Sequence, residues 1–383
     1  VMFFGWNKVS RGFHLASTWL TGLGATISAW WILVANAWMQ HPVGMTFNPD
    51  TVRNEMTDFT AVAFSPTAIV KFFHTISSGW MTGAVFVLGV SCWFLLKKRN
   101  TDLSLRSIKV ASIAGIIDTL VVMGTGDQSG VTMAREQPMK LAAAEGLQQG
   151  GTGAPFSIVP GIEVPKALSI LATHDPEGYV PGIQDLLNGY TLPNGTQSPS
   201  AEEKINRGKK AIQAFGQYRQ LRKTNPQAAQ AALDTLNHHQ AYMGYGYLQN
   251  KEQLVPPIEL VYWSFRLMVG FGSFLFALLI VLGWMAYKQK LHNQRWLLAL
   301  GVAAIPMVYV AGQAGWIVAE VGRQPWAIQD LLPVGVAVSQ LSATNVMVTF
   351  FLFLVLFTLL LIAEVRIMCK AISSYKQNEI SKS

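Results

Sequence analysis

A histidine and a methionine in two apolar stretches of the sequence could together hold a haem iron. His74 lies in IVKFFHTISSGWMTG and Met268 lies in YWSFRLMVGFGSF. A neutral imidazole and a thioether form a known axial pair for low-spin haem iron, in which the thioether raises the reduction potential. Two alternatives remain open, because a membrane histidine can instead make a hydrogen bond between helices and a methionine can simply pack.

An acidic residue near the end of a third apolar stretch also suits a metal site. Glu320 lies in AGWIVAEVGRQPWAI, where Gly322 can end a helix and Pro325 cannot continue one. A carboxylate that loses its hydration there needs a cation beside it, which either an iron ion or Arg323 could supply. Trp316 lies one turn earlier on the same helical face. An iron site and a simple ion pair therefore remain alternatives.

Two further charged residues lie within apolar stretches. Arg266 precedes Met268 by two positions, and a buried guanidinium needs an anion such as a haem propionate. Alternatively, its long side chain could reach the water at the membrane interface. Asp118 could join a proton path or a hydrogen bond between helices, and the sequence does not decide between these roles.

The elements that carry these residues have the composition of membrane-spanning helices. The chain of 383 residues is 51% hydrophobic and 13% charged, whereas soluble domains have about 25% charged residues. A spanning helix needs about 20 mostly apolar residues. Six segments meet this condition, at 15–38, 69–96, 108–125, 258–286, 296–320 and 345–368. The sequence predicts an all-α, polytopic transmembrane bundle of about six spans with a large outer loop domain.

The basic residues between these segments indicate their orientation. Four clusters occur: Lys8 and Arg11; Lys97, Lys98, Arg99, Arg106 and Lys109; Lys288, Lys290 and Arg295; and Arg366, Lys370 and Lys376. All four fall on one side if each segment crosses once, and that side is the cytoplasm. This topology accounts for the net charge of +8. A nucleic-acid partner is not expected, because no basic recognition motif is present.

Three parts of the chain follow from this topology. Residues 1–125 contain three spans and His74, and residues 258–383 contain three more with Met268 and Glu320. The long polar segment 126–257 lies between them on the outer side. Residues 201–223 of this segment have a helix-forming, amphipathic pattern, whereas QQGGTGAPF and TLPNGTQSP are typical of turns. A loop of that length is expected to be functional or partly mobile.

Several stretches along the chain resemble one family. They are GWNKVSRGFHLASTWL, WILVANAWMQHPVG, VKFFHTISSGWMTGAVFVLG, MKLAAAEG, FRLMVGFG and AGWIVAEVGRQPWAI. In this order they are similar to subunit I of cytochrome bd quinol oxidase, over essentially the whole chain. The GRQPW and VKFFHT stretches are the most specific of them.

This resemblance implies roles for individual residues. His74 and Met268 match the axial ligands of the low-spin haem b, with Arg266 beside that haem. Glu320 matches the ligand of one of two high-spin haems, for which we favour the high-spin haem b over haem d. The remaining matches are Trp316 beside the high-spin pair, Arg323 in the GRQPW signature, Lys140 and Glu145 in quinol binding, and Ser28 and Asn36 on a proton or oxygen route.

The sequence departs from the family pattern at its start. In the family about three further spans, with a histidine ligand of the other high-spin haem and two acidic residues of the proton pathway, precede the first span found here. The first residues, VMFFGW, have the composition of the end of an apolar segment. We therefore expect the sequence to be an N-terminally truncated form that holds the low-spin ligands and Glu320 but not the complete oxygen-reducing centre. The resemblance gives Asp118 no role.

The function implied is that of a respiratory terminal oxidase in the bacterial cytoplasmic membrane. Quinol would be oxidised at the periplasmic segment 126–257, with Lys140 holding a quinone oxygen and Glu145 accepting a proton. Electrons would pass through the haems to reduce oxygen to water, generating a proton gradient without a pump. The expected partners are subunit II, small single-span subunits and membrane lipid. Alternatives are a haem b anchor that oxidises quinol without oxygen chemistry, and a transporter that uses the buried charges.

Overall fold

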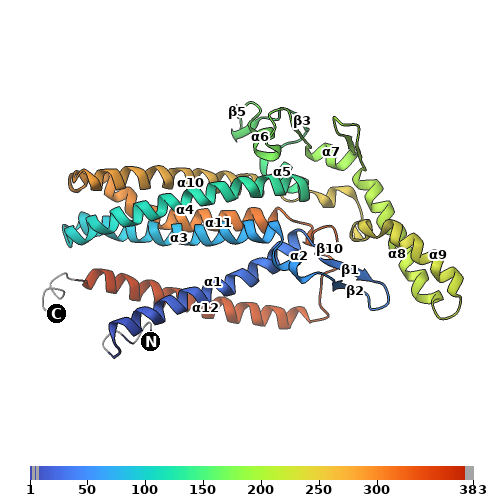
Figure 1. Cartoon of the computed structure of the whole chain (residues 1–383), viewed down its shortest axis with the longest axis horizontal. Coiled ribbons are helices and arrows are strands. Elements are labelled where there is room, and N and C mark those ends of the chain that lie inside the picture. Colours follow the sequence, from blue (N-terminus) through green and yellow to red (C-terminus); the bar gives the residue numbers. More distant parts are fainter. Residues whose placement is uncertain (2–4, 6–7, 376–383) are drawn as a thin grey trace. The chain divides into compact units, whose positions relative to one another are not determined.

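The computed structural model describes residues 1, 5 and 8–375, with the backbone alone at residue 292. Within these residues six helices are long and apolar enough to cross a membrane. They are α1 (Arg11–Gln40), α3 (Pro66–Leu96), α4 (Thr101–Glu136), α10 (Ile258–Tyr287), α11 (Arg295–Val321) and α12 (Ala343–Ser374) (Figure 1). The predicted all-α membrane fold with six spans is confirmed. Residues 2–4 and 6–7 of the N-terminal apolar stretch, and Lys376 of the last basic cluster, lie outside the described residues.

The third spanning helix continues well beyond the predicted end of its apolar segment. The prediction ended this segment at residue 125, whereas α4 continues to Glu136. The added residues, GDQSGVTMARE, are mostly polar, so a hydropathy pattern cannot include them. Their backbone hydrogen bonds need no apolar side chains, and the helix ends only just before Pro138. The start of the predicted outer segment therefore lies inside a continuous helix.

The chain between α4 and α10 is folded into short elements. Its helices are α5 (Pro138–Glu145), α6 (Ala167–Thr173), α7 (Ile183–Asn188), α8 (Ala201–Leu221), α9 (Pro226–His239), η1 (Gln240–Tyr247) and η2 (Lys251–Leu254). Its strands are β3 (Gly151–Thr152), β4 (Phe156–Val159), β5 (Ile162–Val164), β6 (Tyr179–Val180), β7 (Tyr190–Thr191) and β8 (Gln197–Ser198). They form the antiparallel pairs β3–β6, β4–β5 and β7–β8.

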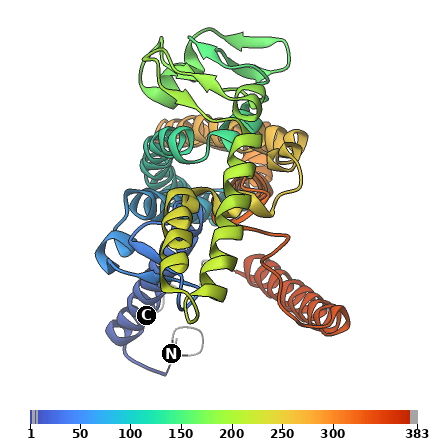
Figure 2. The ribbon, with the colours of Figure 1, turned by 90° about the vertical axis from the view of Figure 1, so that its right-hand side faces the viewer.

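Local sequence signals explain the longest of these elements. The Ser200 side chain accepts from the backbone of Glu203 and caps α8, which confirms the helix predicted at 201–223. Asn225 caps α9, and Pro226 takes the first helical position, where its missing N–H costs nothing. The two helices pack side by side in an antiparallel pair (Figure 2). Gly195 adopts a φ of 84° in the turn between β7 and β8, in one of the two stretches predicted to contain turns.

A small hairpin that follows α1 is joined to α8. Strands β1 (Met45–Asn48) and β2 (Arg53–Met56) pair antiparallel, and α2 (Phe59–Ala63) follows them. Asp50 in their turn accepts hydrogen bonds from Tyr218 on α8 at 2.8 Å and from Arg222, the C-cap of α8, at 2.9 Å. These charged hydrogen bonds hold the pKa of Asp50 below its usual range. The segment between the first two spans is thus attached to the segment between the third and fourth.

The described chain divides into two compact units. The first contains residues 1–80, 118–271 and 310–336, and the second contains residues 81–117, 272–309 and the described residues from 337 onward. The second unit has an apolar core that includes Val85, Leu88, Leu275, Leu279 and Leu282. Every predicted site residue lies in the first unit. Strands β9 (Trp326–Ile328) and β10 (Leu332–Pro333) also belong to it.

Candidate functional site

His74 lies on α3 with one ring nitrogen directed at α4. Its Nδ1 is 3.0 Å from Oγ1 of Thr125. Gly126 faces the same ring, because a Cβ at that position would lie 3.6 Å from Cε1 of the imidazole. The side chain is half-buried. Since Nδ1 is engaged with Thr125, Nε2 is the nitrogen left to bind another group.

Met268 lies on α10 with its sulfur directed at α11. A Cβ at Gly315 would lie 3.0 Å from the Met268 Sδ, which is tighter than ordinary van der Waals contact. Glycine at position 315 therefore leaves room for the thioether. Each of the two predicted iron ligands thus faces a glycine of a neighbouring helix, Gly126 for His74 and Gly315 for Met268.

Arg266 is bound to the predicted quinol-site segment rather than exposed at an interface. Its guanidinium donates to Glu145 Oε2 at 2.8 Å, to Ser157 O at 2.6 Å and to the carbonyl of Ala144. The guanidinium carbon also lies 3.8 Å from the ring centre of Tyr262, a cation–π distance. The side chains of Arg266 and Glu145 are only 8% and 3% exposed. The guanidinium therefore already has an anionic partner within the chain.

Glu320 lies at the end of α11 and is held by two side chains. Its Oε1 accepts from Asn36 Nδ2 at 2.8 Å, and its Oε2 accepts from Arg323 Nη2 at 2.7 Å. The ion pair with Arg323, one of the two predicted alternatives, is present. The Glu320 side chain nevertheless remains 36% exposed, whereas that of Arg323 is 8% exposed. The described residues therefore do not enclose the Glu320 side chain.

Asn36 links Glu320 to a lysine that the sequence analysis did not select. Its Oδ1 accepts from Lys71 Nζ at 3.0 Å and from Gln40 Nε2 at 3.1 Å. Lys71 lies on α3, three residues before His74. Its signal in the sequence is the lysine of VKFFHT, which the analysis took only as part of a family stretch.

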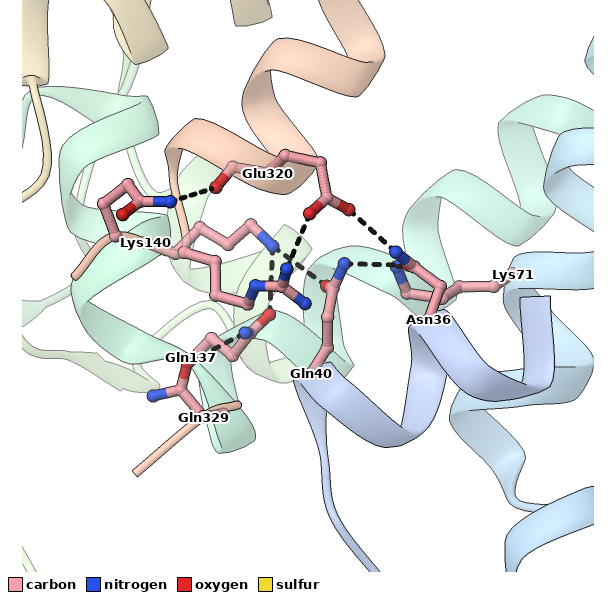
Figure 3. Close-up of polar contacts among 9 residues, drawn as sticks. Asn36, Gln40, Lys71, Gln137, Lys140, Glu320 and Gln329 are labelled. Atoms are coloured by element: carbon pink, nitrogen blue, oxygen red, sulfur yellow. Dashed lines mark hydrogen bonds and ion pairs between the residues drawn. The ribbon is translucent and has the colours of Figure 1, made fainter. Parts of the chain in front are cut away.

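Lys140 is buried at the other end of this network. Its Nζ donates to Gln40 Oε1 and to Gln137 Oε1, both at 3.0 Å. Figure 3 shows Lys140 between Gln40 and Gln137, and Asn36 between Gln40 and Glu320. Gln137 continues the chain of hydrogen bonds to Gln329 at 3.0 Å. Side chains from α1, α3, the α4–α5 segment, the end of α11 and the segment after it therefore meet in one partly buried polar network.

Burial shifts the pKa values of Lys140, in this network, and of Glu145, in the pair with Arg266, in opposite directions. Burial holds the pKa of Lys140 well below its usual range, and the charges of Lys71 and Arg323 lower it further. Burial raises the pKa of Glu145 above its usual value, although Arg266 opposes this shift. Nε and Nη1 of Arg323 are buried and have no hydrogen-bond partner within the described residues. These two nitrogens of Arg323 can therefore donate hydrogen bonds to a further group near Glu320.

The other predicted residues occupy more open positions. Trp316 is 42% exposed on α11, one turn before Glu320. Ser28 is exposed on α1, two turns before Asn36. Asp118 is half-buried on α4. The structure therefore brings Asn36, but not Ser28, into contact with Glu320.

A family model described as cytochrome bd terminal oxidase subunit I matches residues 1–376. The chain belongs to this family. It is 37% identical to the cytochrome bd-II ubiquinol oxidase subunit 1 of Escherichia coli (strain K12), over 97% of this chain and 74% of that protein. It is 33% identical to the cytochrome bd ubiquinol oxidase subunit 1 of Bacillus subtilis (strain 168), over 88% of this chain and 62% of that protein.

The fold also agrees with that of a solved structure. The bd oxidase from Geobacillus thermodenitrificans superposes with a TM-score of 0.70 at 23% identity, over 96% of this chain and 72% of that one. The predicted resemblance to cytochrome bd subunit I is therefore confirmed, as is the class of quinol-oxidising oxidoreductase. Membership in a membrane oxidase family, as subunit 1, implies haem cofactors, a quinol substrate and a partner subunit. A transporter is no longer supported.

The residues around His74 and Met268 fit a bound haem. His74 presents Nε2, the nitrogen not engaged by Thr125, and a haem-ligating histidine needs one free ring nitrogen. Gly126 and Gly315 stand where a larger side chain would crowd the two ligands. Gly79, on the same helix as His74, would meet no other atom within 4 Å if it carried a Cβ. The glycines at positions 126 and 315 therefore leave room for the two ligand side chains themselves.

Proposed function

We propose that this chain is the haem-bearing subunit of a respiratory terminal oxidase that oxidises quinol and reduces oxygen to water. His74 and Met268 would hold a low-spin haem b, and Glu320 would hold a high-spin haem b beside a haem d. When bound, these haems supply the electron transfer and the oxygen chemistry. The observation that carries the proposal is the family match over residues 1–376, supported by the free Nε2 of His74.

The protein residues at the quinol site would bind the quinol and accept its protons. Quinol oxidation releases two protons, and a general base works best when its pKa lies near the operating pH. Burial moves the pKa of Glu145 upward from its usual value, in the direction that suits such a base. Arg266 fixes the carboxylate in place. We propose Glu145 as the first proton acceptor and Lys140 as the residue that holds a quinone oxygen.

We also propose an orientation of the chain in the membrane. The basic clusters of the short loops would lie on the cytoplasmic side of a bacterial inner membrane, and residues 126–257 would form the quinol-binding segment on the periplasmic side. Residues 1–125 and 258–383 would carry the spans with the haem ligands. Protons from quinol would leave outward while those for water formation enter from inside, so a proton gradient forms without a pump. Subunit II, small single-span subunits and lipid would complete the assembly.

Oxygen uptake by the assembled complex tests this function. Membranes that carry the protein with its partner subunit should consume oxygen when supplied with a quinol, and Glu320→Gln should abolish the uptake because a neutral amide is a poor ligand for iron. Thr132→Val, at a residue whose hydroxyl only donates to the carbonyl of Gln128 on its own helix, should leave the rate near that of the wild type. Quinol oxidation without oxygen uptake in the wild-type complex would instead support the haem anchor.

A further inference from the structure

Thr125 joins His74 to the backbone of α4 through two consecutive hydrogen bonds. Its Oγ1 lies 3.0 Å from Nδ1 of His74. The same hydroxyl donates to the carbonyl of Val121, one turn earlier on α4, at 2.7 Å. The carbonyl of Val122 lies 3.2 Å away as a second acceptor for the same proton.

The direction of the hydrogen bond between Thr125 and His74 depends on the tautomer of the ring. A threonine hydroxyl has one proton and two lone pairs. Two backbone carbonyls, of Val121 and Val122, lie within reach of that proton. When either carbonyl takes it, Oγ1 offers His74 a lone pair and Nδ1 carries the shared proton. The neutral ring then has its lone pair on Nε2, which is the tautomer that can bind a metal.

We infer that Thr125 is a positioning residue for the haem ligand His74, because it fixes the imidazole tautomer and the orientation of the ring. This inference rests on the proposed function, in which His74 binds a haem iron. Metal-ligating histidines generally donate their other ring N–H to an acceptor, which fixes the tautomer and makes the ring a stronger donor to the metal. The Thr125 hydroxyl, beside the backbone carbonyl of Val122, occupies the place of that acceptor.

The residue after Thr125 lies beside the same edge of the ring. A Cβ at Gly126 would lie 3.6 Å from Cε1 and 4.0 Å from Nδ1 of His74, which is ordinary van der Waals contact. The α4 backbone at Gly126 therefore leaves room for the imidazole, and the polar contact with Thr125 is the one that orients the ring.

The hydrogen bond has an electronic consequence for a bound haem. Donation from Nδ1–H to Thr125 increases the negative charge on the ring, and a more basic imidazole stabilises ferric over ferrous iron. Loss of the acceptor should therefore raise the midpoint potential of the low-spin haem. A residue that only packed against α3 would not cause such a shift.

The test compares two substitutions at position 125 in the complete complex with its partner subunit. Thr125→Val keeps the shape and removes the hydroxyl, whereas Thr125→Ser keeps the hydroxyl. Thr132→Val is the matched control, because the Thr132 hydroxyl also donates to a carbonyl one turn earlier, that of Gln128 at 2.9 Å. A redox titration of the low-spin haem and its electron paramagnetic resonance spectrum are the readouts.

We expect Thr125→Val to raise the midpoint potential and to change the anisotropy of the low-spin spectrum, which depends on ring orientation. Thr125→Ser and Thr132→Val should match the wild type. Loss of the haem in Thr125→Val with retention in Thr125→Ser would also support the inference, since only the hydroxyl separates them. An unchanged potential and spectrum in Thr125→Val, or equal losses in both position-125 variants, would overturn it.

A separate variant, His74→Ala, tests the proposed function independently of the role of Thr125. His74→Ala should remove the low-spin haem signal whatever the role of Thr125. A retained signal in His74→Ala would reject His74 as a ligand and thereby the basis of this inference. A lost signal in His74→Ala with no effect of Thr125→Val would reject only the positioning role.

Discussion

The carboxylate of Glu145 on α5 lies 2.8 Å from the guanidinium of Arg266 on α10, and both side chains are almost fully buried. This ion pair connects the segment proposed to bind quinol to the helix that carries Met268, two residues further along. A displacement of α5 on quinol binding would therefore act on Arg266, two residues before the proposed haem ligand Met268. Distance alone does not create such coupling, but a shared ion pair can.

The buried pair predicts a large loss of stability when one partner is removed. Arg266→Met leaves the Glu145 carboxylate buried without a cation, which typically costs about 3–5 kcal/mol. The unfolding temperature of the purified complex should fall clearly, and Arg266→Met combined with Glu145→Gln should recover much of the loss. Arg207→Met is the control, because the exposed Arg207–Glu203 pair should contribute about 1 kcal/mol or less. Equal effects at positions 266 and 207 would contradict this account.

Lys140 predicts a specific dependence of stability on pH. Its pKa in the folded protein lies well below the usual value of 10.5, so the unfolded chain binds the proton more tightly. The free energy of unfolding should therefore rise with pH between the folded pKa and about 10.5. Lys140→Met removes this contribution, so any advantage of the variant in unfolding temperature should shrink from pH 7 to pH 10. A difference that is constant with pH would show that Lys140 is not desolvated in the complex.

Asn36 and Thr26 differ in their expected effects although both lie on α1. Asn36→Leu removes hydrogen bonds to Glu320, Lys71 and Gln40, and unpaired buried polar groups cost about 1–3 kcal/mol each. The variant should lose stability and should perturb the visible spectrum of the proposed high-spin haems. Thr26→Ala, which removes only a hydrogen bond to the carbonyl of Gly22 on the same helix, should change neither. Comparable spectra in the two variants would argue that Asn36 does not position Glu320.

Gly322 is predicted to tolerate no side chain. A Cβ there would lie 2.4 Å from the carbonyl of Val318 and 3.0 Å from Cγ of Lys140. Gly322→Ala should therefore displace the Lys140 segment and destabilise the complex by about 1–3 kcal/mol. Gly335→Ala is the control, because a Cβ at that position meets no atom within 4 Å. Thermal unfolding of both variants measures the difference, and a wild-type unfolding temperature for Gly322→Ala would contradict the close packing.

Some of this site could be predicted from the sequence because single residue types carry the signal. An imidazole, a thioether and a carboxylate in apolar segments stand out, and the apolar runs that contain them correspond to helices. The end of α4 could not be predicted in this way, because its last turns are polar and only the helix backbone continues through them.

The contacts between distant segments were beyond the reach of local patterns. Arg266 was expected at a haem propionate or at the interface, and nothing local indicates that Glu145, 121 residues away, is its partner. Thr125 resembles any helical threonine that bonds its own backbone. Its second bond, to His74, depends on how α3 and α4 pair. Pairing of this kind is set by the packing of whole helices.

The central claim is that His74 and Met268 hold a low-spin haem b. A reduced-minus-oxidised visible spectrum of membranes carrying the protein with its partner subunit tests it most directly, with His74→Ala and Met268→Leu measured beside the wild type. We predict b-type bands and a far-red chlorin band in the wild type, with the low-spin component lost in His74→Ala and lost or shifted in Met268→Leu. Wild-type low-spin bands in both variants, at equal protein content, would contradict the claim.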